Sequence, residues 1–164
     1  MAEPALREIM RREVPTLALT DTVAKVARVL AESGLPGVPV VEDGVVVGIV
    51  TDKDIVQREA NVSSPTVVPF LDHFFVADAG HKLPEELEKI LATDAESLMT
   101  HPVINIRDSA SLEDTATVMI DRDVSVLPVL DHENNLVGIV SRADLVAVIA
   151  RLENSRQESE PANS

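Results

Sequence analysis

The sequence contains no cysteine, no tryptophan and no tyrosine, and its aromatic side chains are three phenylalanines. Without cysteine the chain can form no disulfide, no thiolate nucleophile and no zinc–thiolate site. No apolar stretch approaches the length of a membrane-spanning helix. Residues 1–4 also lack the basic and then apolar pattern that begins a secretory signal. We therefore expect a cytoplasmic protein that does not enter a membrane.

Basic residues are scarce. The chain has 14 Lys and Arg against 28 Asp and Glu, which gives a formal net charge of −14. Nucleic-acid binding usually requires clustered Lys and Arg that neutralise phosphates, and anionic membrane surfaces attract the same kind of cluster. We expect neither partner. At 164 residues and 45% hydrophobic content, the chain can bury the core of one or two small domains.

Sequence motifs of the common catalytic sites are also missing. We find no Gly-x-Ser-x-Gly nucleophile elbow, no P-loop and no His-Glu-x-x-His zinc motif. The four histidines, His73, His81, His101 and His132, form no closely spaced pair that would suggest a metal site. The sequence therefore favours a protein that is not an enzyme and has no dedicated metal centre.

The chain does contain one sequence motif that occurs twice. Residues 48–54 read Gly-Ile-Val-Thr-Asp-Lys-Asp, and residues 138–144 read Gly-Ile-Val-Ser-Arg-Ala-Asp. Upstream matches recur 89 positions apart, at Met10 and Met99, Val14 and Val103, Thr22 and Ser111, Ala27 and Ala116, Pro39 and Pro128, and Val40 and Val129. Two units are too few for a solenoid, so we expect a pair of units packed face to face.

Each unit shows the order strand, helix, strand, strand, helix. The strands are expected at residues 14–19, 38–41 and 45–50, and again at 103–106, 127–130 and 136–140. The first helix of each unit should be capped near Thr22 and Ser111 and should end near Gly34 in the first unit. The second helix should start at Thr51 and at Ser141. The fold class is therefore α+β, an α/β sandwich.

The repeats divide the chain into four expected segments. The first motif covers residues 1–60 and the second covers residues 95–152. Residues 61–94 form an unrepeated insert with Phe70, Phe74 and Phe75, and with a helix expected near Pro84. Such a phenylalanine cluster is either part of a core or a surface for a partner. The polar tail, residues 153–164, is expected to be disordered.

Thr51 and Asp54, and likewise Ser141 and Asp144, combine a hydroxyl with a carboxylate at a helix start. A carboxylate can accept both hydrogen bonds of a vicinal diol, and charge-assisted bonds of this kind are stronger than neutral ones. The free amides of a helix start also suit a phosphate. The same residues could instead form capping boxes that only stabilise the helices. The two interpretations compete for the aspartate.

Two such motifs in register, with their upstream matches, resemble the CBS domain family, named after cystathionine β-synthase. The resemblance covers about residues 10–57 and 99–150 and is to a tandem pair, or Bateman-type module. It implies two motifs packed about a pseudo-twofold axis, with clefts that bind adenosine derivatives such as AMP, ADP or ATP. The chain would then sense the energy or metabolite state of the cell, commonly as a homodimer.

The resemblance also assigns roles to residues. Asp54 and Asp144 would bind ribose hydroxyls, and Thr51 and Ser141 would contact ribose or phosphate. The residues that would flank adenine are Val14, Thr16, Val38, Pro39, Val103, Asn105, Leu127 and Pro128. Basic side chains near the helix starts or before the first strands are candidate phosphate contacts, namely Lys53, Arg142, Arg12 and His101.

Several alternatives stay open. The ligand could be S-adenosylmethionine, or the chain could be a ligand-independent dimerisation or protein-interaction module. Hydrolysis of the nucleotide is the least supported interpretation. No cofactor is expected, although Mg²⁺ could accompany a nucleotide because it would offset repulsion by the acidic protein. An effector protein that reads the bound state is expected.

Overall fold

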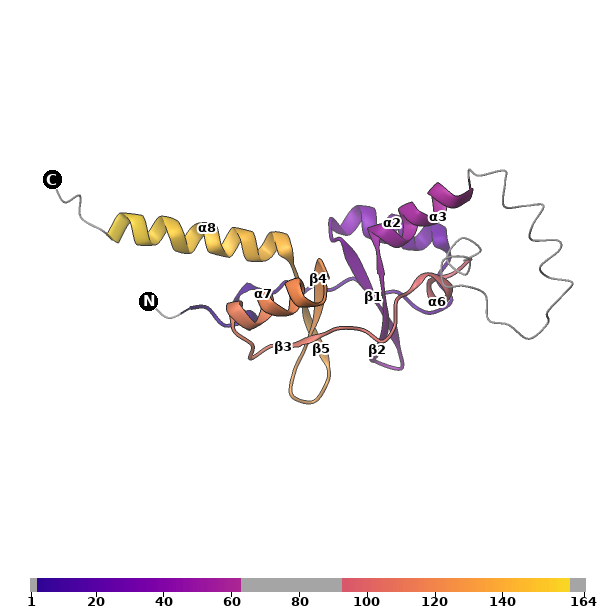
Figure 1. Ribbon diagram of the computed structural model, residues 1–164. Helices are drawn as coiled ribbons and strands as arrows, with labels where there is room; N and C mark the ends of the chain where they lie inside the picture. Colours follow the sequence, from indigo (N-terminus) through magenta and orange to yellow (C-terminus); the bar gives the residue numbers. More distant parts are fainter. Residues whose placement is uncertain (1–2, 63–92, 160–164) are drawn as a thin grey trace, which may run out of the picture. The chain divides into compact units, whose positions relative to one another are not determined.

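The computed structural model describes residues 3–62 and 93–159 (Figure 1). The three phenylalanines and the helix expected near Pro84 lie outside the described residues. The chain divides into two compact units. Among the described residues, the first-repeat unit comprises 16–42, 47–62 and 93–101, and the second-repeat unit comprises 3–15, 43–46 and 102–159.

The first-repeat unit follows the expected order of helices and strands. Its described elements are α2 (Val23–Ser33), β1 (Gly37–Glu42), β2 (Val45–Thr51), α3 (Asp52–Val62) and α6 (Ala95–Leu98). The Thr22 hydroxyl caps α2 by accepting the Lys25 N–H at 3.2 Å, and Gly34 ends it at φ 66°. Asp43 and Gly44 both have positive φ, as the tight turn of the β1–β2 hairpin requires.

The second-repeat unit has the same architecture. Its described elements are α1 (Leu6–Ile9), β3 (Ile106–Arg107), α7 (Leu112–Asp121), β4 (Val126–Leu130), β5 (Leu136–Ser141) and α8 (Arg142–Ser159). Strand β3 pairs in parallel with β4, and β4 pairs antiparallel with β5. Ser111 and Asp114 form a capping box at the start of α7. The expected α+β class is thus confirmed in both units.

The segment before each repeat packs in the unit of the other repeat. Arg11 exchanges two backbone hydrogen bonds of 2.9 Å with Ile139 on β5, in the second-repeat unit. Thr100 makes the equivalent pair with Ile49 on β2, at 2.8 and 3.1 Å. Residues 3–15 therefore belong to the second-repeat unit and bridge to its strand β5, although in sequence they precede the first repeat.

This exchange explains two repeated residue types. A Cβ atom on Gly138 would lie 2.4 Å from the sulfur of Met10 and 3.0 Å from the carbonyl oxygen of Arg11. A Cβ atom on Gly48 would lie 2.2 Å from the sulfur of Met99. Any larger residue would force the methionine to move, so close packing favours glycine at both motifs. Met10 packs against Gly138, which is 128 positions away in sequence, and Met99 packs against Gly48, which is 51 positions away.

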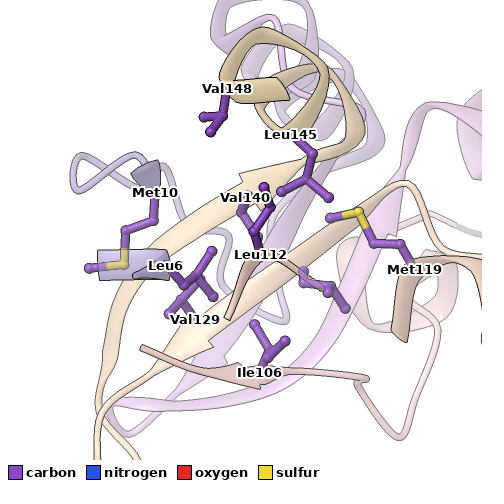
Figure 2. Close-up of a cluster of buried hydrophobic side chains, with 10 residues drawn as sticks. Leu6, Met10, Ile106, Leu112, Met119, Val129, Val140, Leu145 and Val148 are labelled. Atoms are coloured by element: carbon purple, nitrogen blue, oxygen red, sulfur yellow. The ribbon is translucent and has the colours of Figure 1, made fainter. Parts of the chain in front are cut away.

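Each unit has its own hydrophobic core. In the second-repeat unit, side chains of α1, α7 and α8 converge on the sheet, as Figure 2 shows for Leu6, Leu112, Val140 and Leu145 among others. In the first-repeat unit the core is built from α2, the hairpin and α6, with Leu17, Val26, Val38, Val50 and Leu98. Val50 and Val140, which are equivalent positions of the two repeats, are both buried in these cores.

Three expectations about the elements are wrong. The strand expected at 14–19 is a single parallel bridge between Leu17 and Val40, and the one expected at 103–106 is the short strand β3. These segments run beside their neighbours for only a few residues. The tail expected to be disordered from residue 153 is helical to Ser159. Extending an existing helix costs less than starting one, and an Arg156–Glu153 ion pair of 2.8 Å supports it.

The stability of the first-repeat unit is expected to fall in acid. The Ser97 hydroxyl and amide both donate to the Asp94 carboxylate, and they lower the pKa of Asp94. The hydrogen bond from Lys25 likewise lowers the pKa of Asp21. A carboxyl with a lowered folded-state pKa stabilises the fold above its ordinary pKa of about 4, and this contribution disappears as the pH falls below that value.

Asp94→Ala tests this at the cap of α6. We expect it to lower the free energy of unfolding by about 1 kcal/mol at pH 7, as for other N-cap aspartates. The wild-type carboxyl becomes protonated only as the pH falls through its lowered pKa, so the difference between the two proteins should be smaller at pH 3 than at pH 7. Urea unfolding at both pH values measures it. A difference of equal size at both values would contradict the assigned role of the carboxylate charge.

Candidate functional site

The hydroxyl–carboxylate pair of the first repeat lies where β2 passes into α3. The Asp54 Oδ2 atom accepts hydrogen bonds from the Thr51 backbone N–H at 2.9 Å and from the Thr51 hydroxyl at 3.0 Å. The Asp54 N–H in turn donates to the Thr51 hydroxyl oxygen at 3.4 Å. Asp54 is only 3% exposed. The carboxylate is therefore held in one orientation with little freedom to move.

The second repeat reproduces this geometry where β5 passes into α8. The Asp144 Oδ2 atom accepts from the Ser141 N–H and from the Ser141 hydroxyl, both at 2.9 Å. The Asp144 N–H donates to the Ser141 hydroxyl oxygen at 3.3 Å. Ser141 is 2% exposed and the Asp144 side chain is 16% exposed. The repeated sequence motif therefore gives the same hydrogen-bond geometry in both repeats.

Both interpretations of the motif describe part of this geometry. In each pair, Oδ2 performs the capping function, because it satisfies a backbone N–H and the neighbouring hydroxyl. A carboxylate has two oxygens with two lone pairs each, so capping through Oδ2 does not use its full capacity. Capping and ligand binding can therefore use different oxygens of the same aspartate.

Burial distinguishes these pairs from another capping box in the second-repeat unit. At the start of α7, the Asp114 N–H donates to the Ser111 hydroxyl at 2.9 Å, and the Ser111 N–H donates to Asp114 Oδ2 at 3.3 Å. Asp114 is exposed, whereas Asp54 is buried and Asp144 is partly buried. A helix cap alone does not require a buried carboxylate, which costs free energy to desolvate.

Arg11 is the site residue that the sequence interpretation missed. Its Nε atom donates to Asp144 Oδ1 at 3.2 Å, and its terminal nitrogen lies 3.2 Å from the same oxygen. The backbone pairing of Arg11 with Ile139 places it there. The residue 89 positions later is Thr100. A search for matching types therefore passes over this position, and only the exchanged packing of the leading segments reveals it.

The candidate phosphate contacts occupy different surroundings. Lys53 and His101 are exposed. Arg12 donates to the carbonyl oxygen of Arg7 at 2.9 Å. Arg142 donates to the carbonyl oxygen of Val124 at 3.1 Å and pairs with Asp123, so it braces the turn between α7 and β4.

The residues expected to flank adenine also differ in exposure. Val38 and Leu127 are fully buried in the two cores, where they support the strands that carry them. Pro39 and Pro128 are buried as well. Val14 and Val103 are partly buried, and Thr16 and Asn105 are exposed. The last four are the members of this set with side-chain surface available to a small molecule.

Within residues 3–62 and 93–159, no three His, Asp or Glu side chains gather as they would around a metal ion. No helix in this part of the chain combines the length and apolarity needed to cross a bilayer.

Comparison with known proteins identifies the repeated unit. The CBS domain family matches residues 6–61 and 95–151. The protein MJ1426 of Methanocaldococcus jannaschii is 28% identical over 152 residues, which cover 88% of this chain and 90% of that protein. A second protein of that organism, MJ0188, is 32% identical over 139 residues, which cover 85% of this chain. The match spans only 42% of MJ0188.

Solved structures show the same fold. The crystal structure of CBSX2 in complex with AMP, a protein of Arabidopsis thaliana, superposes with a TM-score of 0.70 at 23% identity. The match covers 91% of this chain and 98% of that one. The CBS domain pair of MJ0100, in complex with 5′-methylthioadenosine and S-adenosyl-L-methionine, gives a TM-score of 0.67 at 21% identity. That match covers 94% of this chain and 99% of the other.

Proposed function

Because this chain belongs to the CBS domain family and carries the domain twice, we propose that it is a non-catalytic regulatory module for an adenosine-containing small molecule. The ligand binds at the Thr51–Asp54 pair, at the Ser141–Asp144 pair, or at both. The observation that carries the proposal is the orientation of the two aspartates. Each is fixed through Oδ2 by its own helix start and is largely withdrawn from water.

A fixed, partly desolvated carboxylate suits the vicinal hydroxyls of a ribose. The diol offers two donors close together, and hydrogen bonds to an ionised acceptor are about twice as strong as neutral ones. The cap holds the aspartate before the ligand arrives, so little conformational entropy is lost on binding. Val14, Thr16, Val103 and Asn105 provide the side-chain surface for the base in this proposal.

The chemical class of the ligand is supported by what the relatives of known structure bind. CBSX2 was crystallised with AMP, and MJ0100 with 5′-methylthioadenosine and S-adenosyl-L-methionine. These molecules share adenosine and differ at the 5′ substituent. Adenosine is therefore the part that we assign to both sites here, and AMP, ADP, ATP and S-adenosylmethionine are the candidates.

Regulation follows from differential binding. A ligand shifts a conformational equilibrium only to the extent that it binds one state more tightly than the other. We propose that the chain acts as a cytoplasmic homodimer whose liganded state is read by an effector protein.

A thermal-shift titration of the purified protein tests the proposal. AMP, ADP, ATP, adenosine and S-adenosylmethionine are compared with GTP as the control that keeps ribose and phosphates but changes the base. A ligand at one hundred times its Kd stabilises the native state by about 2.7 kcal/mol, which raises Tm by several degrees. We expect such a rise for at least one adenosine compound and none for GTP. The absence of any rise, or an equal rise with GTP, would contradict an adenosine site.

A further inference from the structure

From the contact between Arg11 and Asp144 we infer that Arg11 selects phosphorylated over uncharged adenosine at the Ser141–Asp144 site. The inference rests on the proposed function and assigns a ligand class to one of its two sites. Arg11 belongs to the same unit as Asp144, and both of its contacting nitrogens lie 3.2 Å from Oδ1. Oδ1 is the oxygen that capping leaves to a ligand.

A ribose that binds to Asp144 Oδ1 must therefore displace the Arg11 guanidinium from that oxygen. The Arg11 side chain is 44% exposed, and ion pairs with this exposure are weak, so its displacement from Oδ1 is not costly. The displaced guanidinium remains anchored beside the site, because the backbone of Arg11 is paired with Ile139. The guanidinium has then lost its ion pair with Asp144 and is available to bind the ligand.

The 5′ substituent decides whether that cation finds a new partner. A phosphate at the 5′ position is on the same sugar that occupies Asp144, and the fork of the guanidinium suits its oxygens. Adenosine has only a hydroxyl there, so its binding breaks the Arg11–Asp144 pair without replacing it. The chain carries a net charge of −14, so a local arginine matters more here for binding an anion than it would on a neutral protein.

The first-repeat unit has a different residue at this position. Thr100 makes the same two backbone bonds to Ile49 that Arg11 makes to Ile139, and Met99 before it packs like Met10. A threonine side chain carries no charge and is shorter. Arg11 therefore makes the two sites chemically unequal although their hydroxyl–carboxylate geometry is the same.

Calorimetric titration with AMP and with adenosine tests the inference. The titrations are made on the Asp54→Asn protein, so that the Ser141–Asp144 site dominates, with and without Arg11→Gln. We expect Arg11→Gln to weaken AMP binding about tenfold, since it removes charge-assisted hydrogen bonds to phosphate. It should leave adenosine binding unchanged or up to about fivefold tighter, because a weak ion pair no longer competes.

Two controls isolate the role of Arg11. Arg7→Gln removes the same charge from the same segment at an exposed position, and it should not alter the ratio of the two affinities. Arg11→Lys keeps the cation and should retain a preference for AMP. Equal effects of Arg11→Gln on AMP and adenosine, or no effect on either, would overturn the inference while leaving the proposed function intact. If the otherwise unaltered protein binds no adenosine compound, the proposed function fails, and the inference fails with it.

Discussion

Replacing both Asp54 and Asp144 by asparagine is expected to weaken ligand binding strongly at both sites. Asparagine keeps the shape of the side chain and one oxygen for the cap, but it removes the charge that strengthens hydrogen bonds to a ribose. Each site should lose about 2 kcal/mol of binding free energy, a factor of about 30 in Kd, the typical value of a hydrogen bond to a charged group. Isothermal titration of the two single variants and the double variant measures this effect.

The matched control for these variants is Asp114→Asn. It alters the carboxylate of a capping box with the same two backbone hydrogen bonds, but at an exposed position on α7. Its effect should be confined to stability and leave ligand affinity as in the wild type. Ligand affinity that is unchanged in the Asp54→Asn, Asp144→Asn double variant would show that the aspartates act only as helix caps.

Substituting alanine for Gly138 or Gly48 is expected to produce the largest loss of stability among single substitutions considered for this chain. The new methyl group would overlap Met10 at Gly138 and Met99 at Gly48. Overpacking of this kind costs about 1–3 kcal/mol. Gly138→Ala should lie near the upper end, because the Arg11 carbonyl oxygen is backbone and cannot turn aside. Urea unfolding of each variant gives the free-energy change.

Double-mutant cycles then test which methionine faces which glycine. Gly138→Ala combined with Met10→Ala, and Gly48→Ala combined with Met99→Ala, should be strongly non-additive because the residues of each pair are in contact. Sequence proximity alone would pair Met10 with Gly48. Additivity within the Met10–Gly138 pair, together with coupling between Met10 and Gly48, would refute the exchange of leading segments.

Local sequence signals predicted the elements that local interactions determine. The caps at Thr22 and Ser111 and the glycine end of α2 follow from side chains within four residues of one another. The hydroxyl–carboxylate pairs are also local, since their partners are three residues apart. Two copies in register made these features recognisable.

Long-range packing was not predictable from the same signals. Residues 3–15 join the second-repeat unit, and the bridge between Arg11 and β5 spans more than 120 positions of sequence. The spacing of apolar residues in the sequence does not indicate a packing partner that distant. Arg11 became a site residue through this packing, and it was hidden because its counterpart, Thr100, differs in type. Helix α8 also continued past the expected boundary at residue 153, because propagation of a helix outweighs a polar composition.

The most direct test of the account is a crystal structure grown with the adenosine compound that gives the largest thermal shift. The account predicts ribose hydroxyls within hydrogen-bond distance, about 2.5–3.2 Å, of the carboxylate of Asp54 or Asp144, with Oδ2 still bonded to Thr51 or Ser141. A nucleoside bound elsewhere, with both carboxylates engaged only in capping, would contradict it.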